Sequence, residues 1–144
     1  MAIVVLAHGG WSAAWAWKKV RPLMAAAGHQ FFTLDSVKIG DGWRVTPNPT
    51  PPDTSPEDFE WISKYRMPQS VKCFEQTLRL QTKLTLPRAY IHCTRYADKK
   101  PFAQFASRAN GEAGWRTYEL DASHSPNVTA PTALMEVLKQ ILPA

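Results

Sequence analysis

The fold is decided by the stretch Ile3-Val4-Val5-Leu6-Ala7-His8-Gly9-Gly10-Trp11, near the start of a chain of 144 residues. The run from 2 to 7 is apolar throughout, without the alternation of a half-buried strand. Such a run is typical of a parallel strand that is covered on both faces. The two glycines after it permit a sharp turn, because glycine tolerates backbone angles that other residues avoid.

A helix and a second strand are expected after this turn. Apolar residues recur at helical spacing between 13 and 27, and Pro22 among them predicts a kink or a restart of the helix. Gly28 stands where a C-terminal cap is expected, and residues 31–34 have the composition of a strand. The order strand, helix, strand predicts a βαβ unit with a right-handed crossover.

The C-terminal part continues this alternation. Strands are expected at 88–94 and 115–120, with a helix at 101–110 between them. Thr129 is expected to cap a last helix with one apolar stripe, made of Leu134, Val137, Leu138, Ile141 and Leu142. The predicted class is α/β, with a short, mostly parallel sheet of about four strands flanked by helices.

Residues 38–86 differ in composition from the rest of the chain. The stretch 38–56 is rich in proline and poor in apolar residues, which excludes the interior of a sheet. We interpret 38–86 as a cap-like segment, a Pro-rich loop plus two short helices. It is inserted between the two sheet halves of a single domain, 1–144.

The two short helices of this segment have recognisable starts. Ser55-Pro56-Glu57-Asp58 is typical of a helix N-terminus, with a serine cap, a proline and two acids. This helix is expected to bury Phe59 and Ile62, and a second short helix is expected to begin at Pro68.

Composition and charge restrict the class of protein. A net charge of +5 would suit nucleic acid, but the basic residues come singly or in pairs and no nucleic-acid-binding motif is visible. The excess of positive charge is instead interpreted as an aid to solubility or as an attraction for small anions. No apolar run approaches the ~20 residues of a membrane span, and no signal-peptide pattern is visible, so a cytoplasmic protein is expected. Cys73 and Cys93 predict neither a disulfide framework nor a metal site, and no cofactor is expected.

Two blocks of the sequence carry a resemblance to a known family. They comprise 3–11, 14–17, Pro22-Leu23 and 27–29 in the first block, and 87–94 and 120–124 in the second. Together they resemble the α/β-hydrolases, and within them the branch of small-ester methylesterases and hydroxynitrile lyases. The resemblance implies a three-layer α/β sandwich and hydrolysis of a small carboxylic ester.

The resemblance is incomplete in the middle of the chain. The family carries a G-x-S-x-G elbow, with the nucleophile serine, after a central strand. Here the sequence passes from Leu34-Asp35-Ser36 into the cap-like segment, and the elbow with its neighbouring strands is missing. A Ser-His-Asp hydrolase without that serine loses its covalent route, although ligand binding can survive.

The resemblance implies roles for the residues that match the family's motifs. His8, Gly9, Gly10 and Trp11 match the oxyanion loop, whose backbone N–H groups face a developing negative charge; a plain strand-to-helix turn is the alternative. His124 matches the general base, with a capping or surface histidine as the alternative.

The acid that orients this base has two candidates. Asp98 is the nearest one after the 88–94 strand, where Arg95 and Tyr96 occupy the first positions at which the acid is expected. Asp121 is the second candidate, although its short spacing to His124 makes a side-chain pair less natural.

The nucleophile also has two candidates. Ser12 lies in Gly10-Trp11-Ser12-Ala13-Ala14, after a strand and before a helix, which is the context of an elbow. The same context suits a helix cap, so Ser12 is either a relocated nucleophile or an N-cap. The other candidate is a water molecule that His124 activates.

Three functions remain open at this point. The chain is a small-ester hydrolase (a carboxylesterase) acting on a small ester or a related apolar ligand, a non-catalytic ligand-binding or interaction module derived from a hydrolase, or an internal-deletion remnant. Because the apolar strand at 2–7 demands cover on both faces, we also predict a homodimer.

Overall fold

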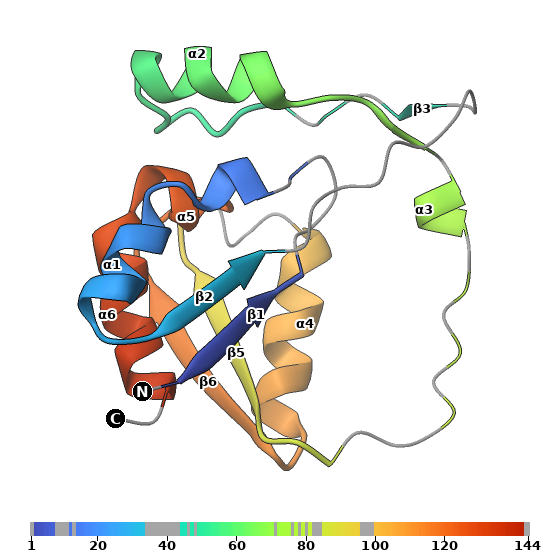
Figure 1. Ribbon diagram of the computed structural model, residues 1–144. Helices are drawn as coiled ribbons and strands as arrows, with labels where there is room; N and C mark the ends of the chain where they lie inside the picture. The colour runs from blue at the N-terminus through green and yellow to red at the C-terminus, as the bar shows by residue number, and fades with distance from the viewer. Residues whose placement is uncertain are drawn as a thin grey trace.

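The computed structural model describes most of the chain. The described residues are 2–7, 12, 14–33, 44–45, 47, 49–70, 72–75, 77, 79, 81, 85–95 and 100–142. Helices and short parallel strands alternate in them, which confirms the α/β class (Figure 1).

The first strand pair lies at the start of the chain. Strand β1 (Ile3–Leu6) pairs in parallel with β2 (Gln30–Thr33), with Ile3 opposite Gln30. A short 3₁₀ helix, η1 (Ala14–Trp17), and α1 (Val20–Ala26) connect them.

The helical segment between β1 and β2 is interrupted after η1 and starts again as α1, in agreement with the predicted restart. Pro22 lies in the first turn of α1, where its missing N–H leaves no helical hydrogen bond unmade. Gly28 has φ of +77°, as expected for a residue that ends a helix in the left-handed region.

The second strand pair has the same arrangement. Strand β5 (Arg88–Cys93) pairs in parallel with β6 (Trp115–Leu120), and α4 (Lys100–Gly111) lies between them in the chain. Two helices end the chain, α5 (Pro126–Thr129) and α6 (Pro131–Ile141).

The prediction that Thr129 caps the last helix is wrong. Thr129 closes the short α5, and α6 follows Ala130, which caps it without a side-chain hydrogen bond. The reason is Pro131, which occupies the first position of α6, the helical position that proline favours most.

The single four-stranded sheet expected from the sequence is not formed by the described residues. The strands form three separate two-stranded sheets, β1 with β2, β5 with β6, and an antiparallel pair of β3 (Arg44–Val45) with β4 (Gln69–Ser70). Hydrophobic patterns identify strands and crossovers, but they do not determine which strand pairs lie side by side.

The core lies between the strand pairs and the helices α1 and α6, which Figure 1 shows on one side of the strands, with α4 on the other. Its buried residues are Val20, Met24, Leu120, Ala122, Leu134, Met135 and Val137. Leu138, Ile141 and Leu142 pack against this cluster, so the predicted apolar stripe of the last helix is confirmed. On the other side, α4 buries the small residues Ala106 and Ala109.

The expectation that strand 2–7 is covered on both faces is wrong for this structure. Alternate residues of a strand point to opposite faces, and only the face that carries Val4 packs on the core. On the other face Ile3 is 68% exposed, Val5 64% and Phe32 of β2 53%.

Helix α2 (Pro56–Tyr65) crosses above the carboxyl ends of the parallel strands (Figure 1). Ser55 caps it as predicted, since its hydroxyl oxygen accepts a hydrogen bond from the Asp58 N–H at 3.1 Å. Ile62 is buried as expected, whereas Phe59 is 53% exposed because it lies on the outer face of the helix. The second short helix, α3 (Lys72–Glu75), begins later than predicted, and strand β4 takes the place of its expected start.

Two contacts fasten α2 to the rest of the molecule. Lys19 Nζ lies 2.6 Å from Asp58 Oδ2 and also donates to the Val128 carbonyl at 3.2 Å. The Trp15 ring meets two aromatic rings of α2, the Trp61 ring edge-on at 5.7 Å and the Tyr65 ring stacked at 6.0 Å. The helix is therefore held in a defined place over the strand ends.

The longest described helix, α4, has 12 residues. Among the helices described, none combines the length and the apolar character that a membrane span requires.

Candidate functional site

His124 lies at the carboxyl end of β6, in the loop that leads to α5. Its neighbours Ala122 and Ser123 are fully buried, and they anchor the loop from which His124 projects as an exposed residue. The His124 ring stacks on the ring of Phe102 in α4, with centroids 4.4 Å apart and 24° between the planes. The sequence therefore places this histidine at the strand edge where ligands bind in α/β sheets, as predicted.

The surroundings of His124 favour its neutral form. Partial burial of the ring, and then the positive charge of Arg66, lower the pKa of His124 from its ordinary value of 6.5. A neutral imidazole at pH 7 is able to accept a proton, as a general base must. Among the described residues, no hydroxyl or carboxylate is hydrogen-bonded to this ring.

Arg66 comes from the end of α2. Its backbone N–H donates to the Ile62 carbonyl at 2.8 Å, which closes the last turn of the helix. The residue is half-buried, and burial lowers the pKa of its guanidinium. No carboxylate within the described part of the chain forms an ion pair with it.

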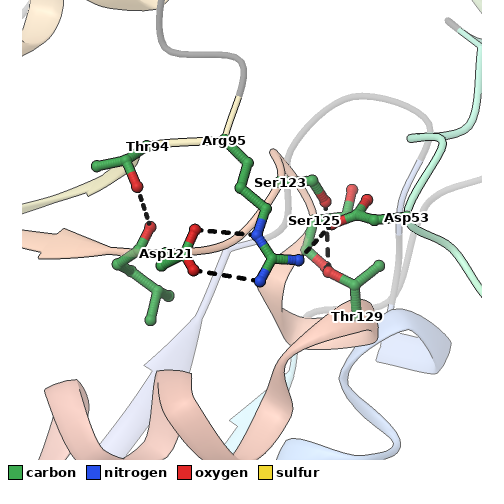
Figure 2. A network of polar contacts seen from close by, with 8 residues as sticks. Asp53, Thr94, Arg95, Asp121, Ser123, Ser125 and Thr129 are labelled. Atoms are coloured by element: carbon green, nitrogen blue, oxygen red, sulfur yellow. Dashed lines mark hydrogen bonds and ion pairs between the residues drawn. The ribbon is translucent and has the colours of Figure 1, made fainter.

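A polar network lies beside this loop, at the ends of β5 and β6 (Figure 2). Arg95 Nε donates to Asp121 Oδ1 at 2.9 Å and its Nη2 donates to Asp121 Oδ2 at 3.2 Å, which makes a bidentate pair. A third nitrogen, Nη1, lies 3.5 Å from Asp53 Oδ2, in the Pro-rich stretch before α2. The network thus connects both strand ends to the cap-like segment.

This network changes the assignment of the acid. The Asp121 carboxylate faces Arg95, and the hydrogen bonds from Arg95 lower its pKa. Both of its oxygens are used there, so the structure does not place Asp121 as the partner of His124. Position 95, at which the orienting acid was first expected, carries an arginine, and this arginine binds Asp121.

The serine beside His124 has a structural role. Ser123 is fully buried, and its hydroxyl lies 3.3 Å from the Thr129 hydroxyl (Figure 2). Thr129 Oγ1 in turn donates to the Ser125 carbonyl at 3.3 Å. These contacts tie the loop to α5 and direct the Ser123 hydroxyl into the protein.

The structure describes only part of the predicted site. Ser12 is half-buried in the segment between β1 and η1, and its described surroundings include no hydrogen bond to His124. The first helical segment begins at Ala14, as a 3₁₀ turn. Asp98 and the expected oxyanion loop, His8, Gly9, Gly10 and Trp11, lie outside the described residues.

The two cysteines lie on different elements, Cys93 in β5 and Cys73 in α3. Cys93 is half-buried in β5, and burial raises the pKa of its thiol, which keeps it protonated. Cys73 is exposed on α3. Among the described residues no group of three His, Cys, Asp or Glu side chains could hold a metal ion.

Sequence reasoning missed Arg66, Phe102 and Asp53 as parts of this region. The proximity of Arg95 and Asp121 could have been predicted from the sequence. They directly follow the parallel strands β5 and β6, whose carboxyl ends lie at the same edge of the sheet. No sequence signal marks Arg66 or Asp53, since each reaches the site only through the placement of α2.

No protein-family model matches this chain, and a search of curated proteins finds no significant match to it.

Proposed function

We propose that this protein is a small-ester hydrolase of the α/β-hydrolase type, with His124 as its general base. The observation that carries the proposal is the position of His124 on the loop after β6, with a pKa lowered by burial and by Arg66. A base of this kind removes a proton from a hydroxyl or a water molecule as it attacks the ester carbonyl.

The nucleophile is then Ser12 or a water molecule, and Asp98 is the proposed orienting acid. The oxyanion that forms would be met by backbone N–H groups of His8-Gly9-Gly10-Trp11, as the resemblance implies. In this proposal the two parallel strand pairs are the flanks of a hydrolase-like three-layer sandwich whose middle strands and elbow are missing. Their separation into two pairs supports it.

The test is the hydrolysis of p-nitrophenyl acetate by the wild type and three variants. Because free imidazole also cleaves this ester slowly, His29→Gln serves as the matched histidine control. His29 lies just before β2, at the opposite ends of the strands, and its Nδ1 accepts a hydrogen bond from the Ala2 N–H at 3.2 Å. Glutamine retains an acceptor there.

The variants distinguish attack by Ser12 from attack by a water molecule. We expect His124→Ala to lower kcat/KM at least about a hundredfold, the usual effect of a general base, and His29→Gln to leave it unchanged. An equal loss in Ser12→Ala identifies a serine route, and a loss in His124→Ala alone identifies an activated water. A wild type no faster than His124→Ala refutes the hydrolase.

A second function is a binding module that has lost catalysis. It is favoured by the absence, within the described residues, of a carboxylate on His124, and by the engagement of Asp121 with Arg95. A ligand of this module would be a small ester or a related apolar molecule. Saturable binding of such a ligand without turnover would support this function over the first.

We also propose a homodimer in the cytoplasm. The exposed side chains of Ile3, Val5 and Phe32 form an uncovered apolar face, which a second copy would shield. The two free cysteines suit a reducing compartment. Sedimentation velocity at micromolar concentration is expected to give a dimer, and Val5→Lys a monomer. Thr117→Lys, on an exposed position of β6, is the control, and a monodisperse wild-type monomer would refute the dimer.

A further inference from the structure

Strand β1 has an outer edge that is unpaired within the described part of the chain. The strand pairs with β2 on one side, and no other described strand joins this sheet. In a parallel pair, alternate residues of a strand turn their backbone N–H and C=O groups to the neighbour. The Gln30 N–H donates to the Ala2 carbonyl at 2.9 Å, which sets Ala2 and Val4 toward β2. The backbone groups of Ile3 and Val5 therefore point to the outer edge.

The side chains of the same two residues lie on the bare face of the sheet. Ile3 is 68% exposed and Val5 is 64% exposed. Phe32 lies directly opposite Val5 on β2, and it is exposed as well. Apolar side chains that are neighbours in the sheet thus meet water beside a row of unpaired backbone groups. An apolar strand with a free edge is a template for the addition of another strand.

The chemistry of this edge suits a second strand of the same sequence. Strand β1 reads Ile3-Val4-Val5-Leu6, and neither β1 nor β2 contains a charged residue. Pairs of β-branched side chains across neighbouring strands stabilise a sheet. Each copy of the chain carries a net charge of +5, and an uncharged edge lets two copies meet without like charges opposite one another. A charged peptide would find no counter-charge on these two strands.

We propose that β1 pairs in antiparallel orientation with β1 of a second copy, across a twofold axis at Val4. The two strand pairs then form one continuous sheet in the order β2, β1, β1, β2. This step rests on the homodimer proposed above and specifies its interface. With Ile3 opposite Val5 of the second copy, every outward N–H and C=O group of both residues is paired. The facing side chains lie about 5 Å apart and shield one another from water.

The experiment is backbone amide hydrogen exchange, followed by NMR at two concentrations. The amides of Ile3 and Val5 should exchange at least about tenfold more slowly where sedimentation velocity shows a dimer than at a dilution that gives the monomer. The Val4 amide is the internal control, because it faces β2 in both states. Val5→Lys should abolish the slower exchange at Ile3, since it places lysines along the joined edge. Thr117→Lys, at an exposed position of β6, should retain it.

The outcomes separate this strand pairing from the homodimer and from the hydrolase. A dimer whose Ile3 and Val5 amides exchange as fast as in the monomer uses another surface, which refutes the strand pairing and leaves the homodimer standing. A chain that is monomeric at every concentration refutes both. Equal effects of Val5→Lys and Thr117→Lys also refute the strand pairing, because added charge alone would then explain them. None of these results depends on ester cleavage, so the p-nitrophenyl acetate assay tests the hydrolase independently.

Discussion

The attachment of α2 through Lys19 and Asp58 leads to a stability prediction that can be worked out from the structure. Asp58→Asn keeps the size of the side chain and removes its charge. The two charged atoms are 2.6 Å apart, and the exposed fractions of the side chains are 37% for Lys19 and 10% for Asp58. The pair is thus buried on the acid side only.

The expected loss lies between the values for surface and buried pairs. Two unit charges about 4 Å apart attract by about 4 kcal/mol near a protein surface, and desolvation of the carboxylate offsets much of this. The Lys19 ammonium can turn to solvent when its partner is removed, so the penalty is smaller than for a fully buried pair. We expect Asp58→Asn to lower the free energy of unfolding by about 1–2 kcal/mol.

Urea denaturation measures the free energy of unfolding of Asp58→Asn, and Glu57→Gln is the matched control. Both acids lie in the first turn of α2, where negative charge interacts favourably with the helix dipole, but only Asp58 meets Lys19. Glu57→Gln is expected to cost about 0.3–1 kcal/mol. A double-mutant cycle with Lys19→Met should give a coupling energy of about 1 kcal/mol. Equal losses in the two acid variants, with no coupling to Lys19, would refute the ion pair as an anchor of the helix.

Three further predictions follow from the fold. Gly28→Ala should lower stability by about 1–2 kcal/mol because φ is +77° there, whereas Gly111→Ala, at the end of α4 with open space around it, should be neutral or stabilising in the same urea assay. Met24→Ala removes a fully buried side chain and should cost about 2–5 kcal/mol, which thermal unfolding would detect. The hydrogen bonds from Arg95 lower the pKa of Asp121 below 3.8, so this aspartate adds stability above its ordinary pKa. The gain disappears as the pH falls through the folded-state value. Denaturation of Asp121→Asn across this range should show a deficit at neutral pH that vanishes in acid, and a deficit independent of pH would contradict the assignment.

The strands and helices could be predicted because each carries its own local signal. The apolar run at 3–6, the cap at Ser55 and the apolar stripe of α6 are readable without knowledge of the rest of the chain. The cap of α6 was predicted at the wrong residue because two signals for a helix start lie two positions apart. Thr129 is a typical cap and Pro131 a typical first residue, and α6 begins at Pro131.

The contacts that build the site could not be predicted in the same way. Lys19 and Asp58 are 39 positions apart, and Arg95 and Asp53 are 42 apart. Their meeting depends on where α2 is placed over the strand ends, which no local pattern determines. The position of His124 could be predicted because it follows a recognisable strand, whereas the effect of Arg66 on its pKa depends on the placement of α2.

The central claim is that His124 acts as a base whose pKa is set by its burial and by Arg66. The direct test compares two pH titrations, the His124 ring signals by NMR and kcat/KM for p-nitrophenyl acetate. Because only the neutral imidazole accepts a proton, kcat/KM is expected to fall as the pH falls through the pKa of His124. Both titrations should give one value, below the ordinary 6.5, and both values should rise together in Arg66→Gln. A rate that is independent of pH while His124 titrates, or a kinetic pKa that stays fixed when that of His124 moves, would contradict the account.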